Sequence, residues 1–217
     1  MSATIELRVL ELLCSRLCHE LISPVTAVNN GMELFADSPS DMMADIVSLV
    51  SASGGQASRK LQFYRIAYGF GGDGAAAPSV TEAGRLVQGL LEGGKVEVAW
   101  PGPGPVGDLR LGREPVKLLL NVALIGAEAL PRGGRLEVTI AAGSPATLRV
   151  AARGENARLN PESAAALADS ASIDHLTPRS VHGFFTRRLA DAMGGTMTVE
   201  EPAPGAVVIT ATAPMSV

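Results

Sequence analysis

Residues 14–31 read CSRLCHELISPVTAVNNG, in which His19 and Glu20 are followed by a proline at position 24. Apolar side chains recur there with the period of an α-helix, so we predict one long helix over residues 4–36. The apolar stripe is centred on Leu17, and its other members are Leu10, Leu13, Cys14, Leu21, Val28 and Met32. This spacing approaches a heptad repeat, which is typical of a seam between bundled helices.

His19 falls about 200° from that stripe when each residue turns the helix by about 100°. Most of its neighbours on that face are polar, which predicts an exposed imidazole. A neutral imidazole is a good nucleophile near neutral pH, and the adjacent Glu20 could accept its ring N–H. We therefore interpret His19 and Glu20 as a candidate catalytic pair, with an ordinary surface histidine as the alternative.

Pro24 interrupts the predicted helix about one turn after Glu20. Proline has no amide hydrogen, so the helical hydrogen bond to the carbonyl of Glu20 is lost, at a cost of about 3 kcal/mol. We hypothesise that a kink at this point sets the geometry of the His19 side chain.

A second helix is predicted over residues 40–69, after the helix-breaking sequence DSPSD at 37–41. Its middle, SASGGQAS, is small enough to permit close helix approach. The two helices form a hairpin, which supplies only half of a four-helix bundle. A second copy of the chain, related by a two-fold axis, is the simplest source of the other half, so we predict a homodimer.

The glycine-rich stretch 69–79 is predicted to link a helical hairpin, residues 1–70, to a second domain, residues 79–217. In the second domain, predicted helices cover 79–91, 113–130, 160–169 and 177–195, and predicted strands cover 95–100, 108–112, 135–142, 146–153, 196–200 and 206–212. This mixture indicates an α+β sandwich, with helices on one side of a mixed sheet.

Composition narrows the classes of partner. The 217 residues carry a formal net charge of −4 and only 4% aromatic residues, which argues against a nucleic-acid-binding protein. The longest charge-free apolar run, Leu118–Ala127, is about half of a bilayer span, and the N-terminal residues do not form a signal peptide. Cys14 and Cys18 lie about one turn apart, which favours reduced thiols and a cytoplasmic protein.

Three segments resemble two-component histidine kinases. CHELISPV at 18–25 resembles their phosphoacceptor box, and LLLNVALIGAEALPRGGRLEV at 118–138 resembles the N box of their nucleotide-binding domain with the strand that follows it. FFTRRLADAMGGTMTVE at 184–200 resembles the last helix and strand of that domain. The resemblance implies a GHKL-type sandwich for the second domain.

The nucleotide-binding positions depart from that pattern. The second asparagine of the N box, a Mg²⁺ ligand in such kinases, is replaced by Ile125, which cannot coordinate a hard cation. In the adenine-binding motif, Ala152 replaces the aspartate and Asn156 replaces a glycine, and the lid segment 178–184 keeps a single glycine. No cradle for a nucleotide phosphate is evident.

A His-Glu hairpin joined to a degenerate kinase-like domain is similar to the ChpT-type histidine phosphotransferases. The resemblance implies a dimeric shuttle that takes a phosphoryl group from the receiver domain of a hybrid histidine kinase and passes it to response regulators such as CtrA and CpdR. It implies phosphorylation of His19, no cofactor in this chain, Mg²⁺ supplied by the receiver, and no nucleic acid or membrane partner. The residues expected to dock the receiver are Ser15, Arg16, Ile22, Ser23 and Thr26. An active kinase with a divergent ATP site, or a non-catalytic scaffold that binds receivers, is the alternative.

Overall fold

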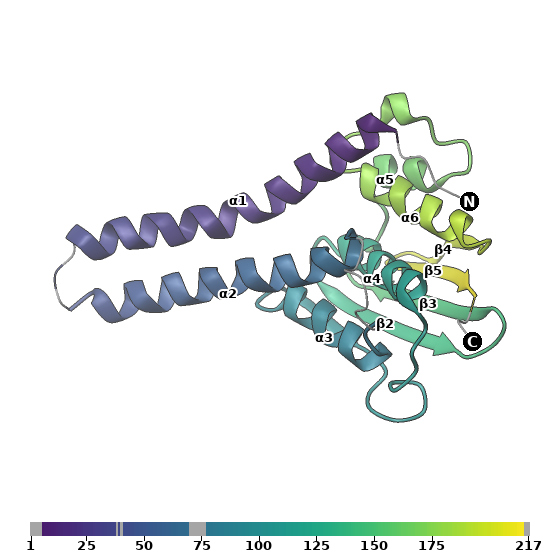
Figure 1. Cartoon of the computed structure of the whole chain (residues 1–217), viewed down its shortest axis with the longest axis horizontal. Coiled ribbons are helices and arrows are strands. Elements are labelled where there is room, and N and C mark those ends of the chain that lie inside the picture. Colours follow the sequence, from purple (N-terminus) through teal and green to yellow (C-terminus); the bar gives the residue numbers. More distant parts are fainter. Residues whose placement is uncertain (1–5, 38, 40, 70–76, 215–217) are drawn as a thin grey trace.

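The structure is a computed structural model that describes residues 6–37, 39, 41–69 and 77–214. Two long antiparallel helices, α1 (Leu7–Asp37) and α2 (Met43–Ala67), project as a hairpin from a compact part that contains the remaining elements (Figure 1). We call that part, residues 77–214, the α/β unit. The predicted hairpin is confirmed, whereas residues 70–76 of the predicted linker, and residues 38 and 40 between the helices, lie outside the described residues.

Gly31 sets how closely the two helices approach. A Cβ atom added at Gly31 would lie 2.5 Å from Cγ2 of Val50, so a larger residue at position 31 would force the helices apart. Gly54 of α2 faces Val28 of α1, but a Cβ atom added there would lie 4.0 Å from Cγ2 of Val28, an ordinary contact. The tight contact of the hairpin is therefore at Gly31 of α1 and not in the small-residue stretch of α2.

The α/β unit contains a five-stranded mixed sheet in the order β1-β2-β3-β5-β4. β1 runs parallel to β2, and all other neighbouring pairs are antiparallel. The strands are β1 (Val96–Ala99), β2 (Gly134–Ala141), β3 (Ala146–Arg153), β4 (Met197–Ala203) and β5 (Ala206–Ala213). The predicted strand at 108–112 is wrong. The carbonyl of Leu109 accepts a hydrogen bond from the amide of Val80 at the start of a helix, so it pairs with no strand of the described sheet, and Leu111 is buried in the core.

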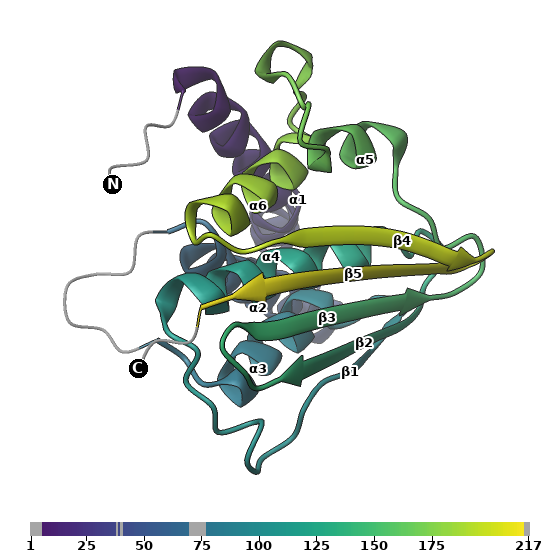
Figure 2. The ribbon, with the colours of Figure 1, turned by 90° about the vertical axis from the view of Figure 1, so that its right-hand side faces the viewer.

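Helices cover one face of this sheet (Figure 2). They are α3 (Val80–Leu91), α4 (Arg113–Glu128), α5 (Pro161–Leu167) and α6 (Val181–Ala192), with a 3₁₀ turn, η1, at Ile173–His175. Residues 115–127 of α4 are all buried, which makes this helix the centre of the core. The other face carries the ion pairs Arg135–Glu97 and Arg153–Glu137, with exposed side chains. The α+β arrangement with helices on one side of a mixed sheet is therefore confirmed.

The last helix begins later than residue 177, where the sequence pattern places its start. The hydroxyl of Thr177 accepts a hydrogen bond from the amide of Ser180, and the hydroxyl of Ser180 accepts one from the amide of Thr177. These reciprocal bonds hold residues 177–180 as a turn, so α6 starts at Val181.

The N-terminal half of α1 lies against the α/β unit. Val9 and Leu13 are buried in a small apolar cluster with Ala166, Leu176, Val181 and Phe184. Leu13, which the helical wheel placed in the intermolecular seam, is only 9% exposed and packs within the chain. Among the described residues, no helix has the length and apolarity needed to cross a bilayer.

Candidate functional site

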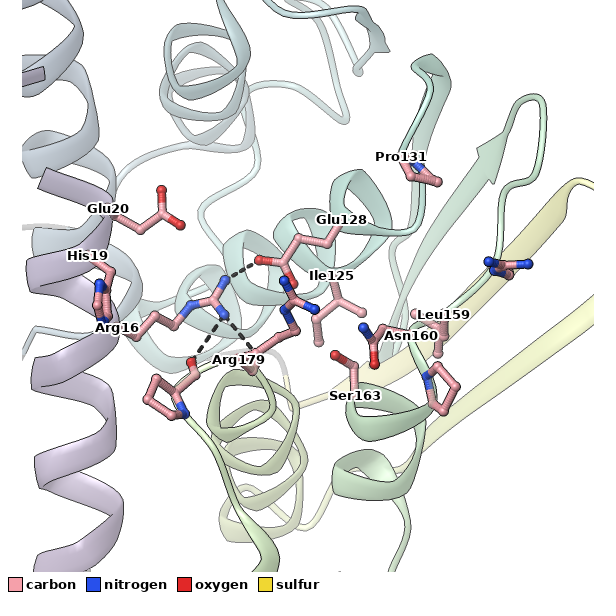
Figure 3. Close-up of a pocket in the computed structure, with 13 residues that line it drawn as sticks. Arg16, His19, Glu20, Ile125, Glu128, Pro131, Leu159, Asn160, Ser163 and Arg179 are labelled. Carbon is pink, nitrogen blue, oxygen red and sulfur yellow. Dashed lines mark hydrogen bonds and ion pairs between the residues drawn. The ribbon is translucent and has the colours of Figure 1, made fainter. Parts of the chain in front are cut away.

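His19 lies exposed on α1, at the edge of a cleft between that helix and the α/β unit (Figure 3). The cleft has a volume of about 680 Å³. Its far wall includes Glu128 at the end of α4, Asn160 before α5 and Arg179 before α6. A histidine on a long rigid helix, facing an open cleft, is accessible to a reacting group on another protein.

Four of the five predicted docking residues are accessible beside His19. Ile22 is 64% exposed, Ser23 and Thr26 are exposed, and Ser15 is half-buried. An exposed isoleucine next to polar side chains is the kind of apolar anchor that a protein partner can cover.

Arg16 does not fit the docking surface predicted for it. Its side chain is turned into the junction between α1 and the α/β unit, and the residue is only 7% exposed. The guanidinium pairs with Glu128 and donates hydrogen bonds to the carbonyls of Arg179, at 3.0 Å, and Pro178, at 3.5 Å. A wheel of the isolated helix could not show that this flank of α1 is covered by the α/β unit.

The Arg16–Glu128 pair continues into a buried polar network. Burial disfavours the charged form of Arg16, but Glu128, together with Tyr68 and Tyr64, outweighs this and raises the pKa of the guanidinium. Burial likewise opposes ionisation of Glu128, yet His182 and Arg16 together hold the pKa of that carboxyl below its usual range. His182 is fully buried, with Nδ1 3.9 Å from the Glu128 carboxylate, and burial lowers the pKa of its imidazole.

Asn121, the retained asparagine of the kinase-like motif, is held entirely by groups of its own chain. Its side-chain amide donates to the carbonyls of Ala67 and Lys117, both at 2.8 Å, and its oxygen accepts from Nε2 of His182 at 2.9 Å. The residue is 0% exposed. Ile125, one turn later, lines the cleft with an apolar side chain. Asn121 thus ties the end of α2 to α4 and α6.

Glu20 is paired with a lysine of the second helix. Its carboxylate accepts from Nζ of Lys60 at 2.8 Å, and its backbone carbonyl accepts from the same nitrogen at 2.9 Å. In Figure 3 the side chains of His19 and Glu20 leave α1 in different directions. The structure therefore directs the carboxylate of Glu20 to Lys60. Sequence reasoning missed Lys60 because 40 residues separate it from Glu20.

The unpaired charges of the cleft are positive. Arg158 and Arg179 line it with exposed side chains, and neither guanidinium has an ion-pair partner among the described residues. The two acids on its walls, Glu20 and Glu128, are each neutralised by an internal cation. In the described part of the chain, no three His, Cys, Asp or Glu side chains gather as a metal site.

Comparison with known proteins agrees with this architecture. The sequence profile of the family described as histidine phosphotransferase C-terminal domain matches residues 80–205. The protein phosphotransferase ChpT of Brucella abortus (strain 2308) is 34% identical over 194 residues, which cover 88% of this chain and 90% of that protein.

Solved structures resemble this chain to different degrees. A bacterial phosphotransferase superposes with a TM-score of 0.81 at 31% identity, over 97% of this chain and 98% of that chain. The histidine kinase AdeS of Acinetobacter baumannii superposes with a TM-score of 0.44 at 14% identity, over 92% of this chain and 98% of that chain. With a family match over more than half of its length and a phosphotransferase relative over most of it, this chain belongs to the ChpT-type histidine phosphotransferases, the phosphotransfer proteins of phosphorelays.

Proposed function

We propose that His19 is the residue that carries the phosphoryl group. The observation that supports this most directly is its position, because it is exposed on α1 beside an open cleft, whereas His182 is fully buried in a hydrogen-bonded network. A nitrogen of the neutral imidazole attacks the phosphorus of a receiver's aspartyl phosphate. A P–N bond forms as the bond between phosphorus and the aspartyl oxygen breaks, and the aspartate leaves as a free carboxylate. The reverse step delivers the group to the next receiver.

The donor in this scheme is the receiver domain of a hybrid histidine kinase, and the acceptors are response regulators of the CtrA and CpdR kind. Ser15, Ile22, Ser23 and Thr26 form the primary docking surface, with Mg²⁺ supplied by the receiver's own acidic pocket. Arg158 and Arg179 support a second contact, because their unpaired positive charges complement that acidic pocket. The two free cysteines are consistent with relay in the cytoplasm.

We further propose that the chain transfers the phosphoryl group without binding ATP. A magnesium nucleotide fits poorly in the cleft, because Ile125 offers no ligand and the side chain of Asn121 is already saturated inside the protein. The only phosphoryl donors in the scheme are then other proteins.

A homodimer is supported by apolar side chains that the single chain leaves uncovered. They lie on both helices of the hairpin, with exposed fractions near one half: Leu10, Val25 and Met32 on α1, and Val47, Leu49 and Leu61 on α2. A two-fold related copy would bury them in a four-helix bundle. In this arrangement residues 1–70 dimerise and carry His19, and residues 79–217 form the degenerate kinase-like domain.

One labelling experiment separates the candidate functions. The purified protein is incubated with labelled ATP and Mg²⁺, or with a labelled phosphorylated receiver. Label that comes only from the receiver, is acid-labile and is lost in His19→Ala supports the relay, and His175→Ala is the matched exposed-histidine control. Self-labelling by ATP would instead identify a kinase, and no label from either source would leave a receiver-binding scaffold.

A further inference from the structure

Pro24 leaves one backbone acceptor of α1 without its helical donor. In an α-helix the amide of each residue donates to the carbonyl four residues earlier, and proline has no amide hydrogen. Pro24 lies inside α1 and is buried, so the acceptor that loses its donor is the carbonyl of Glu20. An unsatisfied carbonyl in a partly buried place destabilises the turn that contains it.

The ammonium group of Lys60, on α2, takes the place of the missing donor. Its Nζ donates to the freed carbonyl of Glu20 at 2.9 Å and to the carboxylate of the same residue at 2.8 Å. The Lys60 side chain is only 17% exposed, so its ammonium is shielded more than that of a surface lysine. One cation therefore binds both the backbone and the side chain of the residue that follows His19.

The clamp formed by Lys60 on Glu20 lies where it can influence His19. Glu20 borders the cleft that contains His19 and also a second hollow of about 450 Å³ that contains Lys60. The hydrogen bond to its carbonyl fixes the course of α1 at this turn, and the bond to its carboxylate determines how far that negative charge lies from the imidazole. The course of α1 and the position of the Glu20 carboxylate both affect the direction in which His19 presents its nucleophilic nitrogen.

We propose that Lys60 is a positioning residue for phosphotransfer: it replaces the hydrogen bond that Pro24 removes and thereby holds the His19–Glu20 turn in its reactive geometry. The inference rests on the proposed role of His19. Pro24 then has a physical role, because the freed carbonyl gives α2 a backbone group to hold beside the reactive residue.

The neighbouring Arg59 provides a matched control. It also binds a carbonyl and a carboxylate, those of Gly89, at 3.1 Å, and Glu92, at 3.0 Å. These partners lie at the end of α3, away from α1. Removing either cation deletes one ion pair and one bond to a backbone carbonyl, but only Lys60 touches the His19 turn.

The test is single-turnover transfer from a phosphorylated receiver at a series of receiver concentrations. For Lys60→Met we expect the maximal rate to fall by about 10- to 100-fold, the usual effect of a misplaced reacting group, with little change in the half-saturating concentration. Lys60→Arg should recover most of the rate, because a guanidinium can donate to both oxygens. Arg59→Met should transfer at the wild-type rate.

A double-mutant cycle tests the connection to proline. Pro24→Ala restores a backbone N–H for the carbonyl of Glu20. Lys60→Met should therefore lower the maximal transfer rate by a smaller factor in the Pro24→Ala background than in the wild type. Equal losses in both backgrounds, a wild-type rate for Lys60→Met, or an equal loss for Arg59→Met would overturn the inference. If Lys60→Met does not fold, the variant Glu20→Gln/Lys60→Met removes the unpaired carboxylate, and its rate is compared with that of Glu20→Gln alone, so that the difference reports on Lys60.

A spectroscopic measurement keeps this inference separate from the proposed function. The ¹³Cε1–¹H NMR signal of the His19 imidazole should shift in Lys60→Met and stay in place in Arg59→Met. This readout needs no phosphoryl transfer. If His19→Ala were still labelled by a receiver, the proposed function would fail while the NMR comparison would still decide whether Lys60 acts on His19. An unmoved signal in Lys60→Met would reject the clamp.

Discussion

Arg16 on α1 and Glu128 at the end of α4 form an ion pair across the junction between the helical hairpin and the α/β unit. Arg16 precedes His19 by less than one helical turn, so the pair attaches the helix that carries His19 to the α/β unit. Because His182 and Asn121 extend the network to α6 and to the end of α2, four helices meet at this point. The cleft beside His19 owes its shape to this attachment.

The first prediction concerns the ion pair itself. Arg16→Met leaves Glu128 without its cation, and we expect the free energy of unfolding to fall by about 2–4 kcal/mol, less than for a fully buried pair since the Glu128 side chain is 35% exposed. Urea denaturation at a fixed protein concentration measures the loss. The double variant Arg16→Met/Glu128→Leu should be more stable than Arg16→Met alone, and equal stability would show that the unpaired carboxylate is not the cause.

The second prediction is a loss of stability in mild acid. The pKa of His182 is lowered in the folded protein from its ordinary value of 6.5, so the unfolded state binds more protons below that pH. Stability should therefore be highest above about pH 7 and fall as the pH drops below 6.5, by at most about 1.4 kcal/mol per pH unit from this one group.

Replacement of the buried imidazole identifies the group responsible. His182→Gln should flatten the dependence between about pH 7 and pH 5, and the exposed control His175→Gln should leave it unchanged. The pKa of Glu128 is also lowered, from 4.5, so its contribution is present above that pH and is lost as the pH falls further, a separate step at more acidic pH. A slope that persists in His182→Gln would contradict the assignment.

The third prediction concerns the dimer. Met32 and Leu61 are 53% and 51% exposed in the single chain and would be buried in the four-helix bundle. A charge at either position should weaken self-association by about 30-fold or more, since a buried unpaired charge opposes the interface. Sedimentation velocity of Met32→Glu and Leu61→Glu measures this. Asn30→Glu is the control, because Asn30 is exposed on the opposite flank of α1, and a wild-type dimer in both test variants would refute the arrangement.

The fourth prediction tests the docking surface through its exposed isoleucine. Ile22→Ala should raise the dissociation constant for a receiver domain by about 5- to 10-fold, which corresponds to roughly 1 kcal/mol of lost apolar contact. Isothermal titration calorimetry with a receiver measures it. Leu34, 51% exposed near the tip of the hairpin, offers Leu34→Ala as a matched control. If the two variants bound equally well, Ile22 would not be an anchor.

The fifth prediction concerns the two unpaired arginines of the cleft. Charge reversal in Arg158→Glu/Arg179→Glu should slow association with an acidic receiver by about tenfold at low salt and reduce its dependence on ionic strength. Stopped-flow association rates at several salt concentrations are the measurement. Arg135→Glu on the outer sheet face is the control, and an unchanged rate in the double variant would remove the second contact from the proposal.

The sequence alone predicted the hairpin, the mixed sheet and the exposed position of His19, since each depends on local periodicity. The strongly apolar stretch 113–130 predicted a helix, and the structure places it, as α4, at the centre of the core. The segment 108–112 shows where local pattern fails. Its alternating pattern resembles a strand, but the carbonyl of Leu109 accepts a hydrogen bond from the first residue of α3. The wheel also placed Leu13 in the dimer seam, although the α/β unit covers it.

Tertiary structure decided how the polar residues of α1 are used. Arg16 and Glu20 both look like surface residues on a helical wheel, yet one is bound by Glu128 and the other by Lys60. Their partners lie 112 and 40 residues away, so no local pattern could pair them. The His-Glu-proline spacing singled out the turn proposed to be reactive, because helix geometry and proline chemistry are local. The groups that hold this turn became visible only when the chain folded and brought α2 and α4 to it.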